Sequence, residues 1–192
     1  MKMQHVNVKL LLKDPEGIDL APLIPIFHSW IEHKEFDELL LDVADYRHVP
    51  EGPGVVLIGH QADYSVDNTQ GRLGVRYNRK AELEAGNAEA LAHSARAALN
   101  ACRKLEDDPR LNGNLRFGGQ EVDVLINDRA LAPNTDAGRN DARAELDAFF
   151  KKLFGGGDFS VVFDTDPRRL LRATAKSSRL FSAAGLQKNL QT

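Results

Sequence analysis

Hydrophobic and polar residues alternate through residues 38–79 in a pattern typical of extended strands. The segments between the extended runs are rich in Gly, Pro, Asp and Asn, the residue types that tight turns require. We therefore predict a three-stranded antiparallel meander over 38–79, around which the rest of the chain is organised. Its expected strands are residues 39–49, 55–66 and 73–78, joined by turns at 50–54 and 67–71.

Alternation also assigns the two faces of the middle strand. Successive side chains of a strand point to opposite faces, so the even-numbered residues of 56–66 share a mostly apolar side that should meet the core. With the second turn centred on Asn68 and Thr69, His60 is expected on this buried side, directly opposite Tyr77.

Val55 and Leu57 fall on the other face of that strand. Apolar residues there need a cover, which a helix, the C-terminal segment or a second subunit could supply. On this basis we predict a homo-oligomer, most simply a two-fold dimer.

Periodicity and capping residues place the elements outside the meander. Apolar residues recur at three- and four-residue steps after Gly86-Asn87, which predicts the clearest helix of the chain. Gly118-Gly119 is interpreted as the turn of a hairpin, and Asp166-Pro167 as the start of a C-terminal helix. Further expected elements are strands at 6–12 and 159–163, a helix that becomes regular near Pro25, and a helix capped by residues 134–136.

Short groups of strands separated by helices favour the α+β class. We expect a largely antiparallel mixed sheet with helices packed on it, ferredoxin-like in part. A doubly wound parallel sheet is the weaker alternative, because hairpins rather than repeated crossovers connect the strands. At 192 residues one domain is the default, and we place it at 1–165.

Charge is unevenly distributed along the chain, whose net charge is −3. Residues 166–192 carry six basic side chains against one acid, which leaves residues 1–165 at −8. We predict that 166–192 is a basic helix or tail that docks on the acidic body or on a neighbouring subunit. A solvated end, or an adaptor surface for another protein, is the alternative. Nucleic acid is not an expected partner, because Phe181 is the only aromatic residue of this segment and offers no stacking series.

Cys102 is the single cysteine and lies on the apolar stripe of the helix that follows Gly86-Asn87. We interpret it as a small buried hydrophobe rather than a nucleophile. A lone cysteine fits a reducing compartment. The chain shows neither an N-terminal apolar signal segment nor a run of about 18 apolar residues. We therefore expect a cytoplasmic protein with no membrane partner.

Motifs for the common cofactors are absent from the sequence. It contains no dinucleotide-binding glycine motif, phosphate-binding loop, paired-cysteine metal site or serine nucleophile elbow. His28 and Glu32 are four residues apart, but no recognised third ligand accompanies them. We predict no cofactor and no metal requirement.

A polar set within the meander forms the candidate site. His60 interrupts an apolar face, and a buried imidazole needs a hydrogen-bonding partner. Tyr77 is its expected cross-strand neighbour, and Asp45 could reach it diagonally from the first strand. A histidine held by an acid and a tyrosine can act as a general acid or base, so His60, Asp45 and Tyr77 are the candidate catalytic residues. The competing interpretation, which we favour, is a structural hydrogen-bond network of the same side chains.

His48, Asp63 and Arg76 complete the set as candidate ligand-binding residues, with Asp63 and Arg76 expected to form a cross-strand ion pair. From these observations we predict a self-associating binding or structural module of unknown ligand, with a small molecule as the candidate ligand. The alternative is a small cofactor-independent enzyme of the isomerase or hydrolase type, acting through the candidate catalytic residues.

Overall fold

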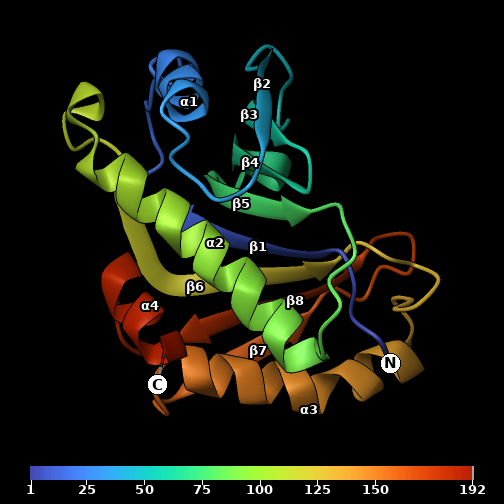
Figure 1. Cartoon of the computed structure of the whole chain (residues 1–192). Coiled ribbons are helices and arrows are strands. Elements are labelled where there is room, and N and C mark those ends of the chain that lie inside the picture. Colours follow the sequence, from blue (N-terminus) through green and yellow to red (C-terminus); the bar gives the residue numbers. More distant parts are fainter. Residues whose placement is uncertain (192) are drawn as a thin grey trace.

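The computed structural model describes residues 1–191, which form one eight-stranded sheet and four α-helices (Figure 1). The strands are β1 (Val6–Leu12), β2 (Leu40–Tyr46), β3 (Gly54–Gly59), β4 (Ala62–Asp67), β5 (Gly74–Arg79), β6 (Phe117–Ile126), β7 (Phe159–Phe163) and β8 (Leu171–Ser177). The helices are α1 (Leu23–Glu32), α2 (Asn87–Asp107), α3 (Asp136–Leu153) and α4 (Ala183–Gln191), with short 3-10 turns at Thr69–Gly71 and Pro109–Leu111.

The strands lie in the order β2-β3-β4-β5-β1-β6-β8-β7, and each of these neighbouring pairs within residues 1–191 is antiparallel. The α+β class with an antiparallel sheet is therefore confirmed. The doubly wound parallel alternative is wrong, because the chain returns through hairpins and long antiparallel connections rather than parallel crossovers.

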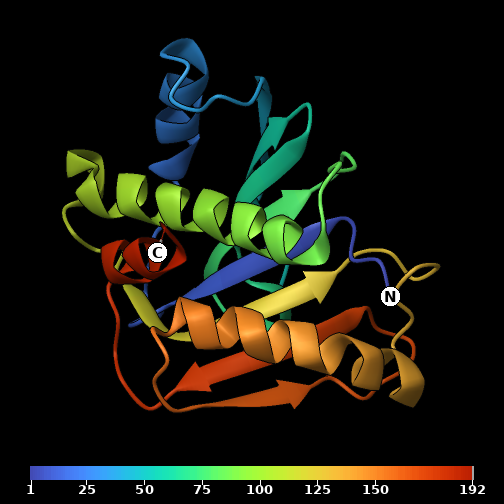
Figure 2. The ribbon, with the colours of Figure 1, turned by 60° about the horizontal axis from the view of Figure 1, so that its bottom comes forward.

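The helices gather on one face of the sheet (Figures 1 and 2). Helix α2 packs on β1 and β5, α3 packs on β7 and β8, and α4 fills the space between α2, α3 and β6. Helix α1 covers β2 and β3. In the described part of the chain, side chains and loops rather than helices form the opposite face of the sheet.

Alternation along the central strands explains this division. Val8 pairs with Tyr77 on one side and Val124 on the other, and Val124 pairs with Ala173. All four are buried under the helices. The residues between them along each strand therefore face the opposite side of the sheet.

The meander has four strands instead of three, because the run 55–66 is broken by a two-residue turn at His60 and Gln61. Gly59 makes this turn possible: a Cβ added there would lie 2.4 Å from the carbonyl oxygen of Ala62. The strands on either side, β3 and β4, form a hairpin in which Leu57 pairs with Tyr64.

This hairpin corrects the prediction for Val55 and Leu57. Reversing the chain at His60 places the odd-numbered residues of β3 on the same side as the even-numbered residues of β4. Val55 and Leu57 are consequently fully buried in the core of their own chain and require no second subunit.

The expected pairing of β4 with β5 is displaced by four residues, so that Tyr64 lies opposite Tyr77. The displacement is even, and an even displacement keeps every side chain on its predicted face. Tyr64 and Tyr77 are both buried, as the alternation predicted.

Two predicted elements are wrong. Gly118-Gly119 lies inside the single long strand β6 and makes no hairpin. Gly119 has a φ of +54°, and a Cβ there would lie 1.9 Å from the carbonyl oxygen of Phe181. A glycine at this position therefore allows the backbone at Phe181 to pass close to strand β6. Asp166-Pro167 begins a turn rather than a helix, because Leu171–Ser177 becomes strand β8 between β6 and β7.

The basic segment 166–192 thus supplies a strand and a helix to the body of the molecule. The helices expected after Gly86 and after residues 134–136 are confirmed. Thr135 caps the second of these by accepting a hydrogen bond from the backbone N–H of Gly138 at 3.0 Å. Cys102 is buried in α2, and burial raises the pKa of its thiol.

Candidate functional site

The sheet face opposite the helices carries a row of polar side chains across five strands. Its centre is fixed by strand register, which pairs Arg76 with Lys9 and Lys9 with Asp123. Ser65 on β4 and Thr174 on β8 extend the row at its two ends. Each of these residues alternates along its strand with residues that point into the core. Their side chains are therefore held on the face opposite the helices, because reversing a strand's faces would expose its core residues.

A second row runs parallel to the first, two residues further along each strand. Leu125 is its apolar member and lies between Asn7 and Arg172. From β4 to β8 the row consists of Asp63, Asn78, Asn7, Leu125 and Arg172.

Asp67 anchors one side of this surface. The ammonium group of Lys9 donates a short hydrogen bond to Asp67, and the two side chains are only 6% and 2% exposed. Arg76 Nη1 lies 3.6 Å from the second carboxylate oxygen of Asp67. Thr69 donates to the same carboxylate from its backbone N–H at 3.1 Å and from its hydroxyl at 2.8 Å. The carboxylate therefore links β1, β5 and the β4–β5 connection.

Asp123 anchors the other side and is almost fully buried. It accepts hydrogen bonds from Arg172 Nη2 at 2.5 Å and from the hydroxyl of Thr174 at 2.6 Å. Arg72 Nη2 lies 3.4 Å from Asp123 and also pairs with Glu121. These partners satisfy a carboxylate that would be costly to bury alone.

Lys9 is the buried amine of this network. Burial lowers the pKa of Lys9, and the carboxylates of Asp67 and Asp123 act in the opposite direction. Because burial has the larger effect, Lys9 loses its proton more easily than a surface lysine does.

Arginines from two further segments form the rim. Arg129 follows β6, and its Nη2 donates to the carbonyl oxygen of Arg168 in the β7–β8 turn at 2.6 Å. In the same turn Arg169 Nη1 lies 3.1 Å from Asp164. Arg168 donates to both carboxylate oxygens of Asp166, which lowers the pKa of Asp166 to about 2.

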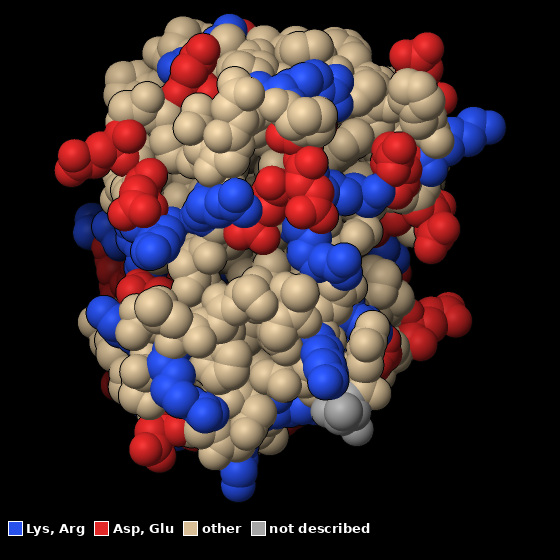
Figure 3. Space-filling view, turned by 90° about the vertical axis from the view of Figure 1, so that its left-hand side faces the viewer, with Lys and Arg blue, Asp and Glu red and all other residues tan. Residues whose placement is uncertain are grey.

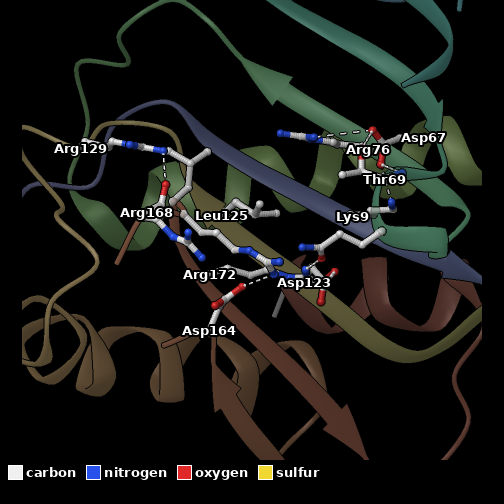
Figure 4. A pocket seen from close by; sticks show the side chains of 13 residues that line it. Lys9, Asp67, Thr69, Arg76, Asp123, Leu125, Arg129, Asp164, Arg168 and Arg172 are labelled. Atoms are coloured by element: carbon white, nitrogen blue, oxygen red, sulfur yellow. Dashed lines mark hydrogen bonds and ion pairs between the residues drawn. The ribbon is translucent and has the colours of Figure 1, made fainter. Parts of the chain in front are cut away.

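Together these residues surround a cavity of about 300 Å³, which we call the arginine pocket (Figure 4). Six of the lining side chains are cationic and three are acidic, while Leu125 and Leu170 supply an apolar wall. The full lining consists of Lys9, Asp67, Thr69, Gln70, Arg76, Asp123, Leu125, Arg129, Asp164, Arg168, Arg169, Leu170 and Arg172.

Two guanidinium nitrogens of the pocket lack an acceptor. Within residues 1–191, Arg76 Nε and Arg172 Nε are buried and make no hydrogen bond. The other nitrogens of Arg172 are engaged, Nη2 with Asp123 and Nη1 with the side-chain oxygen of Gln70. Gln70 itself has a φ of +64°, an unfavourable conformation for a residue with a side chain. Such local strain beside unpartnered polar groups is typical of functional sites.

The structure does not bring His60, Asp45 and Tyr77 together. His60 is exposed in the turn after β3, whereas Asp45 pairs with Val55 at the opposite end of that strand. Asp45 is bound by Arg47 Nε and Nη2 at 2.9 and 2.8 Å, which lowers its pKa to about 2. The expectation failed because it treated 55–66 as one unbroken strand.

Only one of the three candidate ligand-binding residues lines the arginine pocket. Arg76 does so, but its ion pair is with Asp67 rather than Asp63. Asp63 instead binds Lys80 Nζ at 2.6 Å, because the β4–β5 register differs from the expected one. His48 is exposed in the β2–β3 turn.

Tyr77 does join an acid and a histidine, although not those that we expected. Its hydroxyl donates to Glu38 Oε1 at 3.0 Å and lies 3.3 Å from His93 Nε2. Tyr64 donates to the same carboxylate oxygen at 3.3 Å. Burial, followed by the Glu38 charge, raises the pKa of both tyrosines, and burial lowers the pKa of His93. This cluster lies on the helix-covered face, away from the arginine pocket.

Other site classes receive no support from the described part of the chain. Residues 1–191 contain no group of three or more His, Cys, Asp or Glu side chains placed to hold a metal ion. No helix within that range is long and apolar enough to cross a membrane. On the surface in Figure 3, acidic and basic side chains are interspersed instead of forming one basic patch.

Comparison with protein-family models and with curated proteins finds no match to this chain. Function is therefore inferred from the chemistry of the site alone.

Sequence reasoning missed Lys9, Asp123 and Arg172. A signal was present, because each is a charged residue alternating with buried apolar ones in its strand. Strand order was needed to show that they are neighbours.

Proposed function

We propose that this chain binds a small anionic molecule in the arginine pocket, without a cofactor. The observation that carries the proposal is the pair of buried, unpartnered Nε–H groups of Arg76 and Arg172. A buried donor without an acceptor costs about 1 to 3 kcal/mol. An oxyanion bound to either group would remove the cost at that group. Arginine is also the side chain best suited to carboxylate and phosphate oxygens.

The charge of the pocket supports the same function. Its cationic side chains outnumber its acidic ones six to three. Arg168, Arg169 and Arg172 belong to the basic segment 166–192 and all line the pocket. The positive charge that could have served a protein adaptor is thus directed at a small cavity, which favours a small ligand.

Calorimetric titration of the purified protein with inorganic phosphate and with citrate tests this function. We expect Arg172→Met to weaken binding by about tenfold or more, the equivalent of losing one charge-assisted hydrogen bond. Lys176→Met is the matched control, since Lys176 lies on the same strand and the same face but outside the pocket lining. Equal weakening by both substitutions would show general charge attraction and contradict a specific site. Circular dichroism verifies that both variants fold.

A second candidate function is proton transfer by Lys9. Lys9 lines the pocket as an ammonium paired with Asp67, and burial lowers its pKa, which suits it to donate a proton to the carbonyl oxygen of a bound 2-oxo acid and so to make the neighbouring C–H bonds more acidic. This preserves the isomerase alternative but moves it from His60 to Lys9. Solvent deuterium exchange into a bound 2-oxo acid, followed by NMR, tests it: exchange should be lost in Lys9→Met and retained in Lys176→Met. Equal exchange with and without the protein would rule this candidate out.

We retain self-association as a proposal, on a different surface from the one first expected. The edge strand β2 and the residue before it expose Leu39, Leu41 and Tyr46 at 62%, 52% and 44%. Exposed apolar side chains on an unpaired strand edge favour pairing with another copy. Light scattering that detects only the monomer mass at micromolar concentration would exclude it.

A further inference from the structure

We infer that the ligand of the arginine pocket is a small organic dianion, in which two acidic groups are separated by a short apolar segment. This inference rests on the proposed anion-binding function and specifies the chemical class of its ligand. Three zones of the pocket carry it, namely an inner cationic zone, an apolar wall and an outer cationic zone.

The inner zone offers fixed donors to one acidic group. Arg172 is held by Gln70 and Asp123 through its two terminal nitrogens, so its orientation is set before any ligand arrives. Its free Nε–H and that of Arg76 remain as the unused donors of this zone. Preorganised donors bind an oxyanion without further ordering cost.

Charge in the inner zone matches one negative group. Lys9, Arg76 and Arg172 provide three positive charges, and Asp67 and Asp123 provide two negative charges. The adjacent Arg72–Glu121 pair is neutral as a whole. The zone therefore carries a net charge of +1.

The outer zone repeats this balance at the rim. Arg129, Arg168 and Arg169 provide three positive charges, and Asp164 and Asp166 neutralise two of them. A second net charge of +1 remains. In Figure 4, Arg129 and Arg168 lie on one side of Leu125, and Lys9 and Asp67 lie on the other side, so we treat the two zones as separate binding positions.

Leu125 and Leu170 lie in the wall of the same cavity. Leu125 interrupts an otherwise polar row between Asn7 and Arg172. A polar residue would be expected at that position if the pocket held only water and inorganic ions. An apolar segment of the ligand would bury this wall and gain about 25 cal/mol for each Å² removed from water.

A titration series separates the three zones. Adipate has two carboxylates and an apolar spacer, hexanoate has the same length with one carboxylate, and phosphate has no apolar part. We expect adipate to bind at least tenfold more tightly than either of the others. Arg168→Met should reduce adipate affinity toward that of hexanoate and leave hexanoate unchanged. Leu125→Asn should weaken adipate and hexanoate but not phosphate, and Lys176→Met should change none of them.

The possible outcomes distinguish this inference from the function on which it rests. Equal affinities for the three compounds, all reduced by Arg172→Met, would overturn the dianion and leave anion binding intact. Affinities that Arg172→Met does not change would contradict anion binding at this pocket and the dianion with it. Loss of binding in Arg172→Met together with the tenfold preference for adipate would support both.

Discussion

Removal of the Asp67 carboxylate should be far more damaging than a surface substitution. Asp67 is 2% exposed in its side chain and accepts hydrogen bonds from Lys9 and from two groups of Thr69. Asp67→Ala leaves the buried ammonium of Lys9 without its partner and brings it close to Arg76 with no intervening anion. Loss of one member of a buried pair costs about 3 to 5 kcal/mol. For a chain of this length, that corresponds to a fall of about 6 to 20 °C in melting temperature.

Lys9→Met should be milder. Asp67 would keep the two Thr69 donors and the guanidinium of Arg76, so we expect a loss of about 1 to 3 kcal/mol. In the double variant Lys9→Met/Asp67→Ala no buried ammonium remains without a partner. The double variant should therefore be more stable than the sum of the single losses, by about 0.5 to 3 kcal/mol.

Urea and thermal unfolding of the four proteins, followed by circular dichroism, measure these differences. Additive losses in the double variant would show that the pair is not energetically coupled. A melting temperature for Asp67→Ala within about 2 °C of the wild type would refute the reasoning about burial itself.

Three further predictions follow from the turns and crossings. His60→Ala should change the unfolding free energy by less than about 0.5 kcal/mol, because the side chain is exposed, and a loss of several degrees in melting temperature would contradict that position. Gly119→Ala should cost about 2 to 5 kcal/mol through backbone strain and a clash with a carbonyl oxygen 1.9 Å from the new Cβ. Gly156 has a φ of +75°, but no atom lies within 4 Å of the position that a Cβ would occupy, so Gly156→Ala should cost only about 1 to 2 kcal/mol. If denaturant unfolding showed equal losses for Gly119→Ala and Gly156→Ala, the clash with Phe181 would be excluded as a cause. Asp45 should titrate near pH 2 by NMR in the wild type and at a higher pH in Arg47→Met, still below its ordinary value because the backbone N–H of residue 47 keeps donating to it at 3.0 Å. Because its folded pKa is depressed, its stabilising contribution is present above about pH 4 and lost as pH falls toward 2.

Local patterns predicted much of the fold. Periodicity located α2 and α3, and alternation placed Tyr64 and Tyr77 on the buried face even though their pairing was displaced by four residues. A displacement by an even number of residues keeps each side chain on the same face of the sheet. The buried positions of β4 and β5 were therefore predicted correctly, although the pairing of the two strands was not.

The two-residue turn after Gly59 escaped prediction because the apolar alternation on both sides of it has the same phase, with His60 as its one polar member. Gly59 was the one sequence signal that could have indicated this turn. In contrast, Gly118-Gly119 carried a strong turn signal but occurs within a strand, where the backbone near Phe181 approaches closely. Tertiary contact, which local sequence does not encode, decides between these two uses of glycine.

The arginine pocket could not be assembled from the sequence for a related reason. Lys9, Asp123 and Arg172 are separated by long stretches of chain and meet because β1 lies beside β6, and β6 beside β8. Strand order is a property of the whole fold. The alternation pattern relates side chains only within one meander, whose strands are consecutive in the sequence.

A crystal structure determined with adipate at millimolar concentration tests the central claim most directly. We predict density for the anion in the arginine pocket, with one carboxylate within hydrogen-bonding distance of Arg172 Nε and the carbon chain against Leu125. An occupied site elsewhere on the molecule with the arginine pocket empty, under conditions where calorimetry shows saturation, would contradict the claim.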